Sequence, residues 1–226
     1  MYRPLIDRIQ QYVEANALEQ SLLLDLGSGE GSFLQEMSAT FPGRRIGLDI
    51  SKDGIYMSSD HRSDDLFWCV ADLTNLPFAD RKFDVALNIL SPVHYDEIFR
   101  VLKPGAPLIK VIPSSGYLRE LREALYDDEK KNYSNELVMH RLSDECAIRE
   151  KTRVSYVFEL PEIARHHLSA MTPLEWSARA ARLDDLRKNP LSRITIDVEV
   201  SVCLPQRKGQ PRQNRLAERS PGAHDV

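Results

Sequence analysis

The sequence of 226 residues has few cysteines, no long hydrophobic run and no excess of positive charge. Its three cysteines, Cys69, Cys146 and Cys203, form no C-x-x-C pair, which argues against a disulfide framework and a zinc site. No apolar stretch approaches the roughly 20 residues that cross a bilayer, and the N-terminus lacks the profile of a secretion signal. We therefore expect a cytoplasmic protein without a membrane partner or a bound metal.

The charge balance limits the partners that the chain can bind. The formal net charge is −4, so any binding of nucleic acid must come from a local basic face. A hydrophobic content of 42% over this length can form one sizeable core, and we expect one domain over residues 1–204. Residues 205–226 are rich in Gln, Arg, Pro, Gly and Ser, which predicts a disordered tail.

Residues 21–33, S-L-L-L-D-L-G-S-G-E-G-S-F, organise the rest of the chain. The apolar run that ends in Asp25 predicts a buried strand, and glycines follow at positions 27, 29 and 31. Glycine permits a sharp turn and a close approach of ligand to backbone. This G-x-G-x-G differs from the dinucleotide fingerprint, and the preceding acid would repel pyrophosphate but accept an ammonium group. A tight turn in any α/β protein is the alternative interpretation.

Two more acids follow predicted strands. Asp49 lies eighteen residues after Gly31, near the spacing at which α/β nucleotide sites place a carboxylate on the ribose hydroxyls. Asp72 follows the next strand, where its carboxylate could accept from an adenine amino group while the Leu73 amide donates to the ring. Asp49 supports adenosine recognition but would suit NAD equally well.

Strands alternate with helices along the chain. Predicted strands cover residues 21–26, 45–50, 66–70, 83–90, 108–112, 152–160 and 193–204, and predicted helices include 1–16, 96–102, 117–125 and 174–187. The alternation predicts a parallel, doubly wound sheet with a hairpin of strands at its end.

These features resemble the class I S-adenosylmethionine (SAM) methyltransferases along nearly the whole chain. That resemblance implies a Rossmann-like α/β fold with a seven-stranded, mostly parallel sheet and an antiparallel last strand. Several segments are also similar to the bacterial 23S rRNA guanine-N1 methyltransferases, especially the Gram-positive branch associated with tylosin resistance. They include D-L-G-S-G-E-G (25–31), N-I-L-S-P (88–92), Y-L-R-E-L (117–121) and M-T-P-L-E-W (171–176).

The resemblance implies SAM as the cofactor, with contacts at Tyr2, Gly29, Glu30 and Tyr117. Together with the residues singled out above, the predicted cofactor site comprises Tyr2, Asp25, Gly27, Gly29, Glu30, Gly31, Asp49, Ile50, Asp72, Leu73, Asn88 and Tyr117. Family members begin with a four-cysteine zinc ribbon thought to help hold RNA. This sequence starts almost at the matching tyrosine, so we expect the ribbon to be missing and the cofactor site to be intact.

Methyl transfer from a sulfonium needs few reactive side chains, because most of the rate acceleration comes from aligning the nucleophile with the methyl group and the sulfur. A guanine N1 acceptor must lose its proton and leave any base stack. Candidates to hold or activate it are Asn88, Ser91 and, as a base, His94, although a solvated loop residue is the favoured interpretation of His94. Predicted substrate contacts are Pro92, Tyr95, Met171 and Trp176, and packing on the sheet is the alternative for Trp176.

Three functions remain open from the sequence. The first is SAM-dependent methylation of a nucleobase, by resemblance guanine N1 of 23S rRNA, as part of rRNA processing. The second is N-methylation of a heteroaromatic small molecule, which the missing ribbon and the acidic balance favour. The third is a non-catalytic remnant that binds SAM or RNA. The oligomeric state is open, with a homodimer as one option.

Overall fold

The computed structural model describes residues 1–16, 18, 20–37, 41–60, 63–126, 133–165, 172, 174 and 178–206. Their strands form one seven-stranded sheet in the order β3-β2-β1-β4-β5-β7-β6. The strands are β1 (Leu23–Leu26), β2 (Arg45–Asp49), β3 (Leu66–Val70), β4 (Val85–Ile89), β5 (Leu108–Pro113), β6 (Cys146–Glu159) and β7 (Arg193–Pro205). Strands β1 to β5 are parallel, and β7 is antiparallel to both of its neighbours. The predicted fold class is confirmed.

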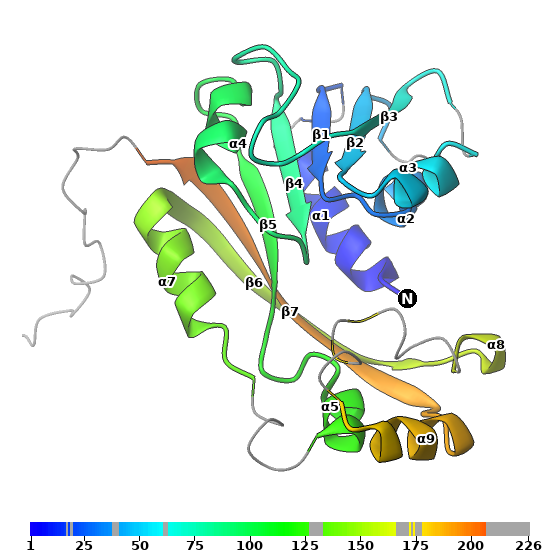
Figure 1. Cartoon of the computed structure of the whole chain (residues 1–226). Coiled ribbons are helices and arrows are strands. Elements are labelled where there is room, and N and C mark those ends of the chain that lie inside the picture. The colour runs from blue at the N-terminus through cyan, green and yellow to red at the C-terminus, as the bar shows by residue number, and fades with distance from the viewer. Residues whose placement is uncertain are drawn as a thin grey trace, which may run out of the picture.

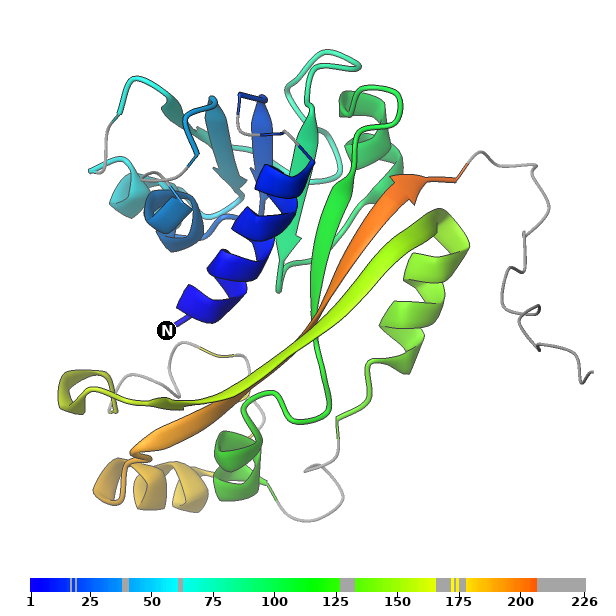
Figure 2. The same ribbon diagram turned by 180° about the vertical axis from the view of Figure 1, so that it is seen from behind.

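Helices cover both faces of the sheet (Figures 1 and 2). They are α1 (Arg3–Ala15), α2 (Ser32–Met37), α3 (Lys52–Ser58), α4 (Tyr95–Val101), α5 (Arg119–Leu125), α7 (Glu136–Glu145), α8 (Glu162–Arg165) and α9 (Ala180–Lys188). Side chains of α1, α2 and α5 belong to one core cluster, and side chains of α4 and α7 belong to the other. Alternate residues of β5 serve the two cores, with Ile109 and Val111 in the first and Leu108 and Ile112 in the second.

The helix α1 is anchored close to the carboxyl edge of the sheet. Pro4 is tolerated in its first turn, and its apolar stripe is fully buried at Leu5 and Ile9. Arg8 forms an ion pair with Glu150 of β6, and the Tyr156 hydroxyl donates to the Met1 carbonyl at 3.0 Å. These contacts fix the N-terminus where the strand ends gather (Figure 1).

The strands β6 and β7 pair along almost their whole length, with one irregularity between Ile148 and Glu150. In both ribbon views this hairpin continues past the carboxyl ends of β4 and β5 and carries α5, α8 and α9 beyond them (Figures 1 and 2). The carboxyl edge of the parallel strands therefore faces a second group of elements.

Two differences from the predicted elements concern this region. The strand β6 begins at Cys146, six residues before the predicted start, because charged side chains alternate along an exposed edge strand. The helix α7 was not predicted from the sequence, because only Leu142 of its ten residues is buried. No helix in the described ranges is long and apolar enough to cross a membrane. Of the tail predicted over residues 205–226, Pro205 belongs to β7, and residues 207–226 lie outside the described residues.

Candidate active site

The turn after β1 places three glycines in the left-handed region, with φ of 79° at Gly27, 56° at Gly29 and 83° at Gly31. The amides of Gly27 and Ser28 both donate to the Leu48 carbonyl at 2.9 Å, which ties the turn to β2. A Cβ at position 27 would lie 2.6 Å from Ser91 Cβ, whereas a Cβ at position 29 would meet nothing within 4 Å. Packing of the protein itself therefore requires Gly27, and Gly29 presents bare backbone to open space.

Asp25 lies beneath this turn and is only 1% exposed. Neither of its carboxylate oxygens has a hydrogen-bond partner among the described residues. Burial, together with the nearby charge of Asp49, raises the pKa of the Asp25 carboxyl to about 7. A buried acceptor without a partner is costly, so an ammonium group that reached this position would find strong compensation.

Asp49 closes β2 on the other side of the turn. Its carboxylate accepts from the Gly29 amide at 2.9 Å and from the Ser51 amide at 2.8 Å. Each oxygen keeps a second lone pair, so the group can still accept from two hydroxyls. The next residue, Ile50, is 70% exposed and can contact a ligand that lies over the strand ends.

Asp72 and Leu73 follow the end of β3, and His94 immediately precedes α4. Hydrogen bonds from Thr74 hold the pKa of the exposed Asp72 carboxyl below its usual range, and His94 adds a smaller contribution. His94 also contributes to the lowered pKa of the Glu97 carboxyl, for which the hydrogen bond from Arg100 is the largest cause. His94 thus lies beside two acids on the β3 side of the site.

Two tyrosines that are 115 positions apart in the sequence meet near the glycine turn. The hydroxyls of Tyr2 and Tyr117 are 2.9 Å apart, and the Tyr2 ring stacks on Phe33 with 5.1 Å between ring centroids. Burial raises the pKa of both phenols, and the charge of Glu30 adds to the effect at Tyr2. Tyr2, Glu30 and Tyr117, predicted as cofactor contacts, are therefore gathered in one place.

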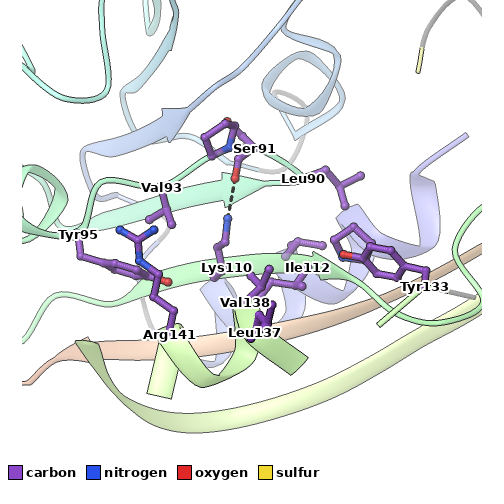
Figure 3. A pocket seen from close by; sticks show the side chains of 13 residues that line it. Leu90, Ser91, Val93, Tyr95, Lys110, Ile112, Tyr133, Leu137, Val138 and Arg141 are labelled. Atoms are coloured by element: carbon purple, nitrogen blue, oxygen red, sulfur yellow. Dashed lines mark hydrogen bonds between the residues drawn. The ribbon is translucent and has the colours of Figure 1, made fainter. Parts of the chain in front are cut away.

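A cavity of about 490 Å³ lies at the carboxyl ends of β4 and β5, under α7 (Figure 3). The guanidinium of Arg141 lies 5.8 Å from the centroid of the Tyr95 ring, and the Tyr95 hydroxyl is buried without a hydrogen-bond partner in the described structure. Lys110 supplies a second cation, and none of the lining residues that the structure describes is acidic. The lining residues are Leu90, Ser91, Pro92, Val93, Tyr95, Lys110, Val111, Ile112, Pro113, Tyr133, Leu137, Val138 and Arg141.

Asn88 connects the glycine turn to this cavity. Its amide nitrogen donates to the carbonyls of Leu26 and Pro92, both at 2.9 Å, and its Oδ1 accepts from Lys110 Nζ. Lys110 Nζ also donates to the Ser91 carbonyl at 2.7 Å. Asn88 is completely buried, so it acts by fixing the end of β1, the loop after β4 and the Lys110 side chain relative to one another.

The structure brings some of the predicted acceptor residues together and separates others. Ser91, Pro92 and Tyr95 line the cavity, whereas His94 is not among its lining residues. Met171 and Trp176 lie outside the described residues. Sequence reasoning missed Lys110 and Arg141, although a lone lysine within the aliphatic run L-I-K-V-I of a central strand was a usable signal.

The chain is similar to known proteins in sequence and in fold. Residues 24–109 match the family model described as a methyltransferase domain. The chain is 40% identical over 210 residues to a Bacillus subtilis protein named "Putative 23S rRNA (guanine-N(1)-)-methyltransferase YxjB", with 90% of this chain and 74% of that protein covered. It is 26% identical to the 23S rRNA (guanine(748)-N(1))-methyltransferase of Streptomyces fradiae, with 90% and 75% covered. The PH0226 protein of Pyrococcus horikoshii OT3 has the same fold at 18% identity, with a TM-score of 0.57 over 91% of both chains.

Proposed function

This chain belongs to the 23S rRNA (guanine-N1)-methyltransferase family, and on that premise we propose that it transfers the methyl group of SAM to N1 of a guanine in 23S rRNA. One observation carries the proposal. The glycine turn, whose buried carboxylate has no partner among the described residues, borders at Ser91 a cavity whose described lining residues include cations but no acid. A cofactor cradle and a base-sized pocket thus share one wall.

The residues around the turn fit the chemical groups of SAM. Asp25 would accept hydrogen bonds from the ammonium of its amino-acid end, and Gly29 would let that end approach the backbone. Asp49 would accept from the ribose hydroxyls, and Asp72 with Leu73 would contact the adenine. Glu30 and the paired hydroxyls of Tyr2 and Tyr117 would border the amino-acid end.

When bound, SAM supplies a methyl group on a positively charged sulfur. The protein aligns the acceptor nitrogen with the methyl group, and such alignment can account for most of the rate gain in a transfer of this kind. The cavity volume lies within the range of small-ligand sites, and its aromatic and aliphatic walls can hold a base that has left its stack. Lys110 and Arg141 disfavour a cationic amine and favour an acceptor with a carbonyl oxygen, such as O6 of guanine.

Methyl-labelled SAM, purified protein and 23S rRNA from cells that lack the gene provide the test. We expect label at N1 of a guanine in 23S rRNA, mapped by mass spectrometry of nuclease fragments. The Asp25→Asn variant is the matched control and should leave the rRNA unlabelled. Label that enters cell metabolites but not rRNA would favour the small-molecule function. SAM binding without transfer to any acceptor would favour the non-catalytic function.

A further inference from the structure

Lys110 is a buried cation that the cofactor site does not use. It is 3% exposed and lies in the central strand β5. Asn88 of β4 and the Ser91 carbonyl contact its amino group, and Ser201 of β7 is its strand partner. The titratable and charged groups around it are Cys203 on β7 and, across the cavity, Tyr95 from α4, Tyr133, and Arg141 from α7.

Within the described part of the chain, the Lys110 amino group has two hydrogen-bond acceptors, which leaves one of its directions open. An ammonium carries three N–H groups, and two of them are directed to Asn88 Oδ1 and the Ser91 carbonyl. A neutral amine has two N–H groups and one lone pair, so the same two acceptors leave the lone pair for the cavity that Lys110 lines (Figure 3). Asn88 Oδ1 and the Ser91 carbonyl can accept hydrogen bonds from Lys110 whether its amino group is protonated or neutral.

We propose that Lys110 is the catalytic base that takes the N1 proton of the guanine held in this cavity, an inference that rests on the proposed function. His94 is unsuited to this task because it is not among the residues that line the cavity. Desolvation lowers the pKa of the Lys110 amino group to about 8, so part of the protein carries the neutral amine near neutral pH.

The proposed step balances without any further reactant. The N1–H bond breaks and the proton bonds to Lys110 Nζ. The electron pair left on N1 would form the bond to the methyl carbon, and the electron pair of the carbon–sulfur bond would leave with the sulfur. Lys110 then gives its proton to water. The new ammonium and Arg141 lie at the cavity wall, where they stabilise negative charge that develops on N1 and O6.

The pH dependence of single-turnover methyl transfer tests the role of Lys110. Because only the neutral amine can accept the proton, the wild-type rate should rise by about tenfold per pH unit and level off near pH 8. Lys110→Arg keeps the charge but stays protonated, so we expect the rate at pH 8 to fall by about 100-fold and the plateau near pH 8 to vanish. Lys103→Arg, at the opposite edge of the sheet, is the matched control and should keep the wild-type profile.

A titration of the amino groups gives a second readout that does not depend on activity. In wild-type protein labelled with ¹³C at lysine Cε, one NMR resonance should titrate near pH 8, far below the usual lysine pKa of about 10.4, and Lys110→Met should remove it. Calorimetry should show SAM affinity close to wild type in Lys110→Arg, whose guanidinium can still donate to Asn88 and to the Ser91 carbonyl.

Two results would overturn this assignment. One is wild-type methylation of guanine N1 together with an unchanged pH profile in Lys110→Arg. The other is the lack of any lysine that titrates near pH 8 in the wild-type protein, a measurement that holds even if both variants fail to fold. A wild-type protein that binds SAM but never methylates guanine would instead refute the proposed function.

Discussion

Replacing Gly27 with alanine is expected to abolish SAM binding. The residue has a φ of 79°, and the new Cβ would lie 2.6 Å from Ser91 Cβ and closer still to its hydroxyl. The left-handed conformation and the overpacking together should cost roughly 2–4 kcal/mol of folding free energy. Ser91 must move to relieve the clash, and its carbonyl accepts a hydrogen bond from Lys110. Equilibrium dialysis with SAM and thermal unfolding would measure both effects.

The chain offers a matched control for this substitution. Gly105 has a φ of 81° with no atom within 4 Å of an added Cβ, and it lies at the opposite edge of the sheet. Gly105→Ala should therefore lose about 1 kcal/mol of stability and keep its SAM affinity. Gly29→Ala should fold equally well but bind SAM more weakly, because its Cβ would occupy the open space in front of the turn. Undiminished binding by Gly27→Ala would contradict the placement of the cofactor.

Replacing Asp25 with asparagine is expected to weaken SAM binding by roughly 100- to 1,000-fold, the loss usual for one partner of a buried, charged hydrogen-bonded pair. The stability of the ligand-free protein should change in the opposite direction. Burial raises the pKa of Asp25 to about 7, so the folded state binds more protons than the unfolded state between pH 4 and pH 7. The contribution of Asp25 to stability therefore falls as pH rises through that window.

An asparagine carries no charge, so Asp25→Asn should be more stable than wild type at pH 8 by roughly 2–4 kcal/mol. Below pH 4 the difference in unfolding free energy should disappear. Calorimetric unfolding of both proteins across this range, without ligand, checks the sign. In the wild type, SAM affinity should fall as pH drops below 7, while the variant should show no such dependence. A variant that is less stable at pH 8, or that binds SAM normally, would contradict the role of Asp25.

The sequence was sufficient to predict that the glycine turn, Asp25 and Asp49 lie together. A glycine series after an apolar run that ends in an acid requires a sharp turn at the carboxyl end of a parallel strand, and Asp49 follows at the spacing of one helix and one strand. Parallel strands bring such ends to one edge, so the meeting of Asp25, Gly29 and Asp49 follows from topology. The placement of Tyr2 beside Tyr117 came only from the resemblance, because no local pattern links residues 115 positions apart.

The residues around the cavity for the methyl acceptor were harder to predict. A polar side chain can bind a substrate only if it is not already hydrogen-bonded within the protein. Asn88 has the right chemistry to bind a base, but all its amide atoms are engaged with Leu26, Pro92 and Lys110. Arg141 reaches the cavity from α7, a helix with too weak an apolar stripe to be recognised. His94 was the sequence's candidate for a base, yet it is not among the residues that line the cavity.

A crystal structure with S-adenosylhomocysteine would test the central claim most directly, since it reports where the cofactor lies. We expect its amino group within hydrogen-bonding distance of Asp25, its ribose hydroxyls on Asp49, and its sulfur directed past Ser91 toward the cavity that Lys110 lines. A ligand bound elsewhere on the protein, or bound at the turn with its sulfur facing away from that cavity, would contradict the account.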